Sequence, residues 1–352
     1  MVARAPSGAC LERLVRMVNP LLRAAQRQCP RTGPGRSPDY QDWQIAALIL
    51  IAILHRRKSK SAQYRFLHER ERQAALQQWL HLQEFPARST YFTRYRQAHR
   101  LFQQAIGLQG LKAIAEGLAD PVTVAVDKSL LAARGPVCHP RRPPPKGADR
   151  DAAWCRNNHH GWVWGYSFET VVSAPKNGLI VPLLASAAAA NASECRTWLD
   201  KASQLPSPTR YVLADAGYDS NDAQEAVEYD QQGRRNGRRF LCPLQARAGK
   251  PAVGRYPHRG RRGQQCQRRQ QRLDFLQTPR GKQLYARRNK TIEPFHEWFK
   301  HAFELTDRVW HRGLDNNQTQ LLAALFAYQL LLRYNHRCGH QNGQIQWILD
   351  TL

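Results

Sequence analysis

The chain has 352 residues, of which 42% are hydrophobic, so it is long enough for two or three domains with a substantial core. Its 53 Lys and Arg against 27 Asp and Glu give a formal net charge of +26, which indicates a polyanionic partner, either nucleic acid or an anionic membrane surface. The longest apolar run, Ile45–Leu54, is about half of the ~20 residues that a membrane span needs, which favours nucleic acid.

The N-terminal residues lack the apolar core of a signal peptide, so we expect the protein in the cytoplasm. The eight cysteines are scattered along the chain without a Cys-x-x-Cys pair. This spacing argues against a structural zinc site, and the expected compartment argues against disulfides, so reduced thiols are predicted.

Residues 1–118 are predicted to be helical. Ser37-Pro-Asp is typical of a helix start, and an apolar helix through Leu54 follows it. Amphipathic stretches come next, and the last helix, which begins near Ser89 or Thr90, carries Arg94 and Arg96 among aromatic residues. Two interpretations stay open: a helix-turn-helix-like DNA-binding region, or a helical bundle with a solvated basic face.

From Pro121 the pattern changes to strands. Alternating valines lead to Asp127, and two further strands are predicted at 162–172 and 179–184. A helix at 191–204, a strand that begins at Tyr211, a helix at 222–230 and a short strand at 239–244 follow. This order predicts an α/β domain with an RNase H-like mixed sheet, whose first strand is central and lies beside the fourth. Asp127 and Asp215 would then be neighbours despite 88 positions of sequence.

Residues 231–290 contain 18 Lys and Arg but a single acid, Asp274. Charge runs are usually solvated linkers, but this one lies between two candidate catalytic segments, so we predict a DNA-clamping insertion. The last helical part is predicted to start near Lys290. The predicted units are a helical DNA-binding region at 1–118, the first part of the catalytic domain at 119–230 and the basic insertion at 231–284. The helices that complete the domain follow at 285–335, and a tail at 336–352.

Three carboxylates stand where a metal-dependent phosphoryl-transfer enzyme needs them. Asp127 and Asp215 each end an apolar strand, Gly217 lets the chain turn away after Asp215, and Glu293 is expected near a helix start. Two divalent ions held by such ligands activate an attacking oxygen and stabilise a leaving one, and hard oxygen ligands suit Mg²⁺. Lys300 lies two helical turns beyond Glu293, on the same face, where its ammonium would meet a phosphate.

Nearby residues compete with these three carboxylates. Asp219 precedes a helix and suits an N-cap better than a metal. Glu297, one turn beyond Glu293, is an alternative to it as a ligand. His296 is either a phosphate contact or a packing or surface histidine.

These segments resemble the DDE transposases of bacterial insertion sequences, in the group with a β-rich insertion between the second Asp and the Glu. The motifs that carry the resemblance are Val124-Ala-Val-Asp127-Lys-Ser, Leu213-Ala-Asp215-Ala-Gly-Tyr-Asp-Ser and Ile292-Glu293-Pro-Phe-His-Glu-Trp-Phe-Lys300. In one respect the chain departs from the family signature. Tyr285 and Arg288 lie one residue too early relative to Glu293, so the signature arginine corresponds to Arg287 or Arg288.

The resemblance implies Mg²⁺-dependent cleavage at the ends of the element, with Mn²⁺ able to substitute, and strand transfer into target DNA. Asp127, Asp215 and Glu293 would hold the metals, while Lys300, Arg287 and Arg288 would contact DNA. The N-terminal helices would recognise the terminal repeats of double-stranded DNA, on which a homodimer is expected, with no membrane partner. Two alternatives remain: a nuclease of the same fold without strand transfer, and an inactive DNA-binding relic.

Overall fold

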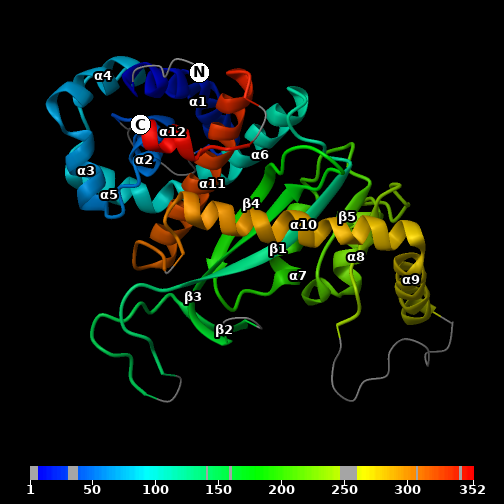
Figure 1. The fold of residues 1–352 in the computed structure, drawn as a ribbon. Coiled ribbons are helices and arrows are strands. Elements are labelled where there is room, and N and C mark those ends of the chain that lie inside the picture. The colour runs from blue at the N-terminus through cyan, green and yellow to red at the C-terminus, as the bar shows by residue number, and fades with distance from the viewer. Residues whose placement is uncertain are drawn as a thin grey trace.

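The computed structural model describes residues 7–30, 39–139, 142–157, 161–245, 260–306, 308–340 and 343–352. The N-terminal part consists of helices that gather at one end of the molecule (Figure 1). They are α1 (Ser7–Gln28), α2 (Asp42–Leu54), α3 (Lys60–Leu67), α4 (Arg70–Leu80), α5 (Arg88–Gln97) and α6 (His99–Ala115). No helix among the described residues is both long enough and apolar enough to cross a membrane.

Helix α2 lies at the centre of this helical part. Every residue from Trp43 to Leu54 is buried, because helices α1, α3, α5, α6 and the C-terminal α11 surround it. A helix that is apolar on every side must be buried on every side. The helix begins at Asp42, and Gln41 and Gln44 form a reciprocal capping box at its start. The predicted start at Ser37 and Pro38 lies outside the described residues.

The sheet contains the strands of the mixed α/β domain, which are β1 (Thr123–Ala132), β2 (Ala153–Asn157), β3 (Gly161–Ser173), β4 (Pro182–Ala189), β5 (Tyr211–Leu213) and β6 (Arg239–Leu241). Its order is β2-β3-β1-β5-β6, and β4 also pairs with β3. The central β1 runs antiparallel to β3 and parallel to β5. The predicted neighbourhood of the first strand and the Tyr211 strand is therefore present, while β2 was not predicted.

Helices cover both faces of the sheet. They are α7 (Glu194–Ala202), α8 (Asn221–Glu228), α10 (Pro279–Ala302) and α11 (Leu314–Arg337), with a 3₁₀ turn η1 (Ala216–Tyr218) after β5. The short C-terminal α12 (Gln346–Thr351) lies by the N-terminal helices instead (Figure 1). Adjacent residues of β3 identify the two faces, since strand side chains alternate. Phe168 contacts Phe299 of α10, whereas Glu169 pairs with Lys201 of α7. Figure 1 shows α10 running across the sheet.

Helix α11 joins the helical part to the sheet. It packs against α1, α2, α5 and α6 on one side and against β4 on the other. The Gln329 amide shows this position, because it donates to the carbonyls of Ile106 in α6 and Pro182 in β4, at 3.0 and 2.7 Å. Both parts of the chain thus share one continuous hydrophobic core, and the N-terminal helices are held in a fixed orientation to the sheet.

The described part of the basic segment is helical. Helix α9 (Gly260–Gln277) ends directly before α10, and no strand lies between β6 and Glu293 among the described residues, so the β-rich insertion implied by the resemblance is not found there. The predicted helix start near Lys290 was wrong. Helix α10 begins at Pro279, where Thr278 caps it by accepting from the Gly281 amide, so Glu293 lies in the helix interior next to Pro294.

Candidate active site

Asp127 and Asp215 lie beside each other at the centre of the sheet. The parallel pairing of β1 with β5 matches Thr123 with Tyr211 and Ala125 with Leu213, a constant offset of 88 residues. The same offset carried forward aligns Asp127 with Asp215, and parallel strands are about 4.8 Å apart. The Asp215 carboxylate is close enough to raise the pKa of Asp127.

The side chain of Asp127 is on the α10 face of the sheet. Asp127 pairs with Thr170 of β3, whose hydroxyl contacts His296 of α10 at 3.0 Å. The next residue, Lys128, points to the opposite face, where its ammonium pairs with Glu194 of α7 at 3.1 Å. Position on β1 therefore decides that the aspartate, rather than the lysine, faces α10.

Asp215 is fixed by the turn that follows β5. One of its carboxylate oxygens accepts from the Gly217 amide at 2.9 Å and caps the 3₁₀ turn. A Cβ on Gly217 would stand 1.9 Å from Oε2 of Glu194, so a larger residue here would displace the Glu194 carboxylate. The sequence predicted Gly217 as the residue that lets the chain turn, and in the structure it lies in the 3₁₀ turn η1, beside Glu194.

An arginine of α10 contacts both Asp127 and Glu293. The guanidinium of Arg288, also on α10, lies 3.1 Å from Asp127 Oδ2 and 3.6 Å from Glu293 Oε1. Arg288 is buried, whereas the Glu293 side chain is 59% exposed. Asp215 is thus the neighbour of Asp127, and Arg288 links Asp127 to Glu293.

The electrostatics at Asp127 are unusual for a carboxylate. Burial raises the pKa of Asp127 from 3.8 to about 7; the Arg288 guanidinium opposes this shift, and the Asp215 carboxylate adds to it. A buried acid with a pKa near neutrality next to a specific charge partner is characteristic of functional sites.

Glu194 is a fourth carboxylate that the sequence did not reveal. It lies in the first turn of α7, close to Asp215, and burial raises its pKa, with Lys128 opposing the shift. No motif marks it. Its only signal is its position at the start of the predicted helix that follows the third predicted strand.

A buried ion pair lies on the α7 face behind the site. Glu169 of β3 pairs with Lys201 of α7 at 2.6 Å and accepts from the hydroxyls of Thr197 and Tyr218 at 2.6 and 3.0 Å. The lysine also donates to Ser186 at 2.6 Å. Because both charges are almost fully buried, this network ties α7, and with it Glu194, to the sheet.

Asp219 anchors the basic helix α9. The prediction that Asp219 caps α8 was wrong. Ser220 caps α8 by accepting from the Ala223 amide at 3.0 Å. Asp219 is buried and accepts from Arg272 at 2.6 Å and from Arg269 at 3.1 Å. Part of the positive charge of the basic segment is thus neutralised within the protein, directly after the Asp215 turn.

Each of the other predicted residues on α10 has its own contacts. Lys300 donates to the carbonyl of Leu130 at 3.2 Å, and burial lowers its pKa. Burial lowers the pKa of His296 to about 3, so this histidine is a neutral packing residue. Tyr285 donates to the carbonyl of Ala214 at 3.1 Å, and Arg287 is half-buried on the same helix.

The two predicted arginines of α5 differ from each other. Arg94 is half-buried, pairs with Asp42 and donates to the carbonyl of Tyr40 at 3.2 Å. Its guanidinium therefore ties α5 to the start of α2. Arg96 is exposed to solvent.

The fold and site define an α/β protein with a mixed sheet and an acidic centre between two strands and a helix. The family model described as Transposase DDE domain matches residues 118–330, which is more than half of the chain and includes Asp127, Asp215 and Glu293. The chain belongs to this family. Comparison with curated proteins and with solved structures gave no match.

Proposed function

We propose that this protein is a transposase that cleaves DNA at the ends of its element and joins them to target DNA. The observation that carries the proposal is that Asp215 lies beside Asp127 and that Arg288 contacts both Asp127 and Glu293, in a strongly basic chain. The family match supports the transposase class.

The donor set suits Mg²⁺, with Mn²⁺ as a substitute, because all three side chains offer hard oxygen ligands. Among the described residues no group of three such side chains is already arranged to hold a metal. Arg288 contacts both Asp127 and Glu293. Asp127, Asp215 and Glu293 would hold the ions once the guanidinium is displaced. Bound divalent ions would activate the attacking oxygen and stabilise the leaving one.

The protein's own cations would position the DNA. Arg288, displaced from the carboxylates, remains on α10 within reach of the same space, and a phosphate is the anion that a guanidinium binds best in bidentate fashion. Lys300 has ammonium hydrogens beyond the one it donates to Leu130, and they would contact a neighbouring phosphate. Arg287 and Arg96 would add weaker contacts to the backbone.

The partner is double-stranded DNA, first the terminal repeats of the element and then the target. Joining two ends requires two active sites near each other, so we propose a homodimer assembled on DNA. Without strand transfer the same carboxylates would make a nuclease, and without any cleavage the protein would be a DNA-binding relic.

The test is a reaction with Mg²⁺ on DNA that carries the gene's own flanking ends. Asp127→Asn should abolish both nicks and joined products. Asp222→Asn, which removes an exposed acid from the first turn of α8, is the matched control and should leave both unchanged. Nicks without joining would replace the proposal by a nuclease, and binding without any metal-dependent cleavage would leave the relic.

A further inference from the structure

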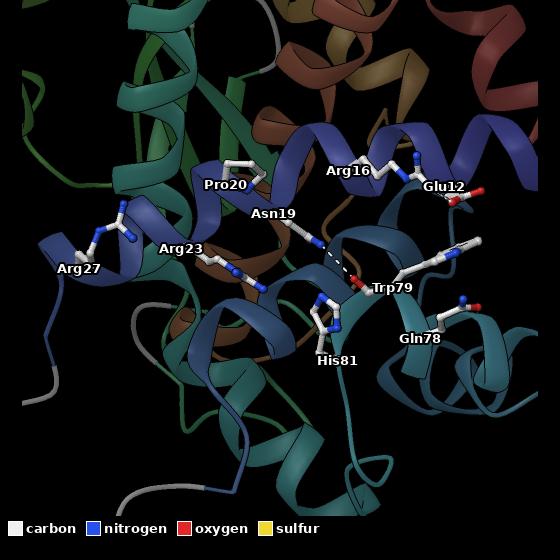
Figure 2. A pocket seen from close by; sticks show the side chains of 9 residues that line it. All are labelled: Glu12, Arg16, Asn19, Pro20, Arg23, Arg27, Gln78, Trp79 and His81. Carbon is white, nitrogen blue, oxygen red and sulfur yellow. Dashed lines mark hydrogen bonds and ion pairs between the residues drawn. The ribbon is translucent and has the colours of Figure 1, made fainter.

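A groove of about 640 Å³ runs between α1 and α4, in the helical part of the molecule (Figure 2). Arg16, Arg23 and Arg27 of α1 line one wall, and Trp79 and His81 line the other. None of these residues belongs to the active site or to α5. The groove is thus a separate feature that the catalytic proposal does not use.

The charge in the groove is positive. Arg16 pairs with Glu12, the only acid in the lining. Arg23 and Arg27 are exposed and have no carboxylate partner within the described part of the chain. The guanidinium of Arg23 lies 4.2 Å from the ring centre of Trp43, which restricts its position. Two cations are therefore available to an anionic ligand.

The walls of the groove are held together by the protein core. The opposite face of α1 buries Leu14, Val18 and Leu22. Across the groove, the Asn19 amide donates to the carbonyl of Trp79 at 3.2 Å, as drawn in Figure 2. The groove is consequently formed before any ligand binds, which lowers the entropic cost of binding.

The spacing of the arginines suits a repeating anion. Arg23 and Arg27 are about 6 Å apart along the helix axis, and Arg16 lies about 10 Å before Arg23. Each strand of duplex DNA presents a phosphate about every 3.4 Å of its axis. A duplex that follows α1 would therefore offer different phosphates to Arg23 and Arg27, the two arginines without a carboxylate partner among the described residues.

The position of the groove separates it from the place of cleavage. In Figure 1, α1 and α4 lie at one end of the molecule and α9 at the other, with the sheet and its central strand β1 between them. DNA that contacts both the groove and the active site must extend across the molecule. The groove would then contact DNA internal to the cleaved end.

We infer that the α1–α4 groove binds the sugar–phosphate backbone of duplex DNA, away from the scissile phosphate and independently of base sequence. The choice of DNA as the polyanion rests on the proposed function; the presence of an anion-binding groove rests on its arginines alone. Backbone contacts of this kind set the register of a duplex without reading bases.

The experiment is DNA binding by the full-length protein, measured by fluorescence anisotropy across a range of salt concentrations. Arg23→Gln with Arg27→Gln removes two phosphate contacts, which should lower the slope of log affinity against log salt by about 1.8. This change in slope corresponds to an affinity for DNA about 60-fold weaker at 0.1 M salt, and the difference disappears towards 1 M salt. The controls are Arg13→Gln, an exposed arginine of α1 outside the groove, which should bind like the wild type, and Arg23→Lys with Arg27→Lys, which should keep the slope.

An unchanged slope in the double glutamine variant would overturn the inference, as would an equal loss in the double lysine variant, because packing rather than charge would then be responsible. A loss seen with single-stranded RNA but not with duplex DNA would overturn the assignment of the ligand. Cleavage is measured in parallel on the same DNA. If the wild type fails to cleave but the double glutamine variant still lowers the salt slope, the groove inference stands and the proposed function fails. If the wild type cleaves but the variant leaves the slope unchanged, the proposed function stands and the groove inference fails.

Discussion

Replacing Asp127 by asparagine should make the metal-free protein more stable above neutral pH, although it abolishes cleavage. Asparagine has the shape of a protonated aspartate but cannot ionise. In the wild type the Asp127 carboxyl holds its proton up to a pKa of about 7, because burial disfavours the charged form. The folded state therefore binds a proton that the unfolded chain has lost.

The magnitude follows from the two pKa values. Because the folded pKa is raised above the unfolded one, the stability contributed by the protonated group is fully present below pH 3.8 and is lost as the pH rises through about 7. A shift of about three units at 1.36 kcal/mol each gives a loss of about 4 kcal/mol in the wild type across this window. The variant should equal the wild type near pH 4 and exceed it by up to about 4 kcal/mol at pH 8.

The assay is equilibrium unfolding in urea with EDTA, followed by circular dichroism from pH 4 to pH 8. Buried histidines with lowered pKa values, namely His55, His296 and His311, change stability in the opposite direction, but they do so in both proteins and cancel in the difference. Mg²⁺ should restore stability to the wild type only. A difference in the free energy of unfolding between the two proteins that does not change with pH would refute the reasoning. The control Asp222→Asn should show no pH-dependent difference from the wild type.

Three further variants test other parts of the site. Arg288→Gln should bind Mn²⁺ about fivefold more tightly without DNA, as an electron paramagnetic resonance titration would show, because no guanidinium competes for the carboxylates; weaker binding would contradict this. Glu169→Gln leaves the Lys201 ammonium buried without its partner and should lower the free energy of unfolding by about 3–5 kcal/mol, with partial recovery when Lys201→Met is added. Asp219→Asn removes the anchor of Arg272, so hydrogen exchange of residues 260–277 should accelerate while that of α1 stays unchanged; equal protection in both proteins would argue against the anchor.

The helices and strands of the catalytic part could largely be predicted because their patterns are local. Alternating valines identified β1, and the apolar segment before Asp215 identified β5. The boundaries of α10 could not be read in the same way. The helix begins 14 residues before Glu293 and passes through Pro294, since packing of Phe295 and Phe299 in the core outweighs the local cost of a proline.

From the sequence alone we predicted the three carboxylates, the adjacency of the first and fourth predicted strands and the excess of positive charge, because residue type, periodicity and motif spacing are properties of neighbouring positions. Only the tertiary structure decided which partners these side chains have. Arg288 lies between Asp127 and Glu293, and Glu194 approaches Gly217, because separate strands and helices bring them together. Such contacts depend on how the elements pack, and no local pattern in a single sequence records that packing.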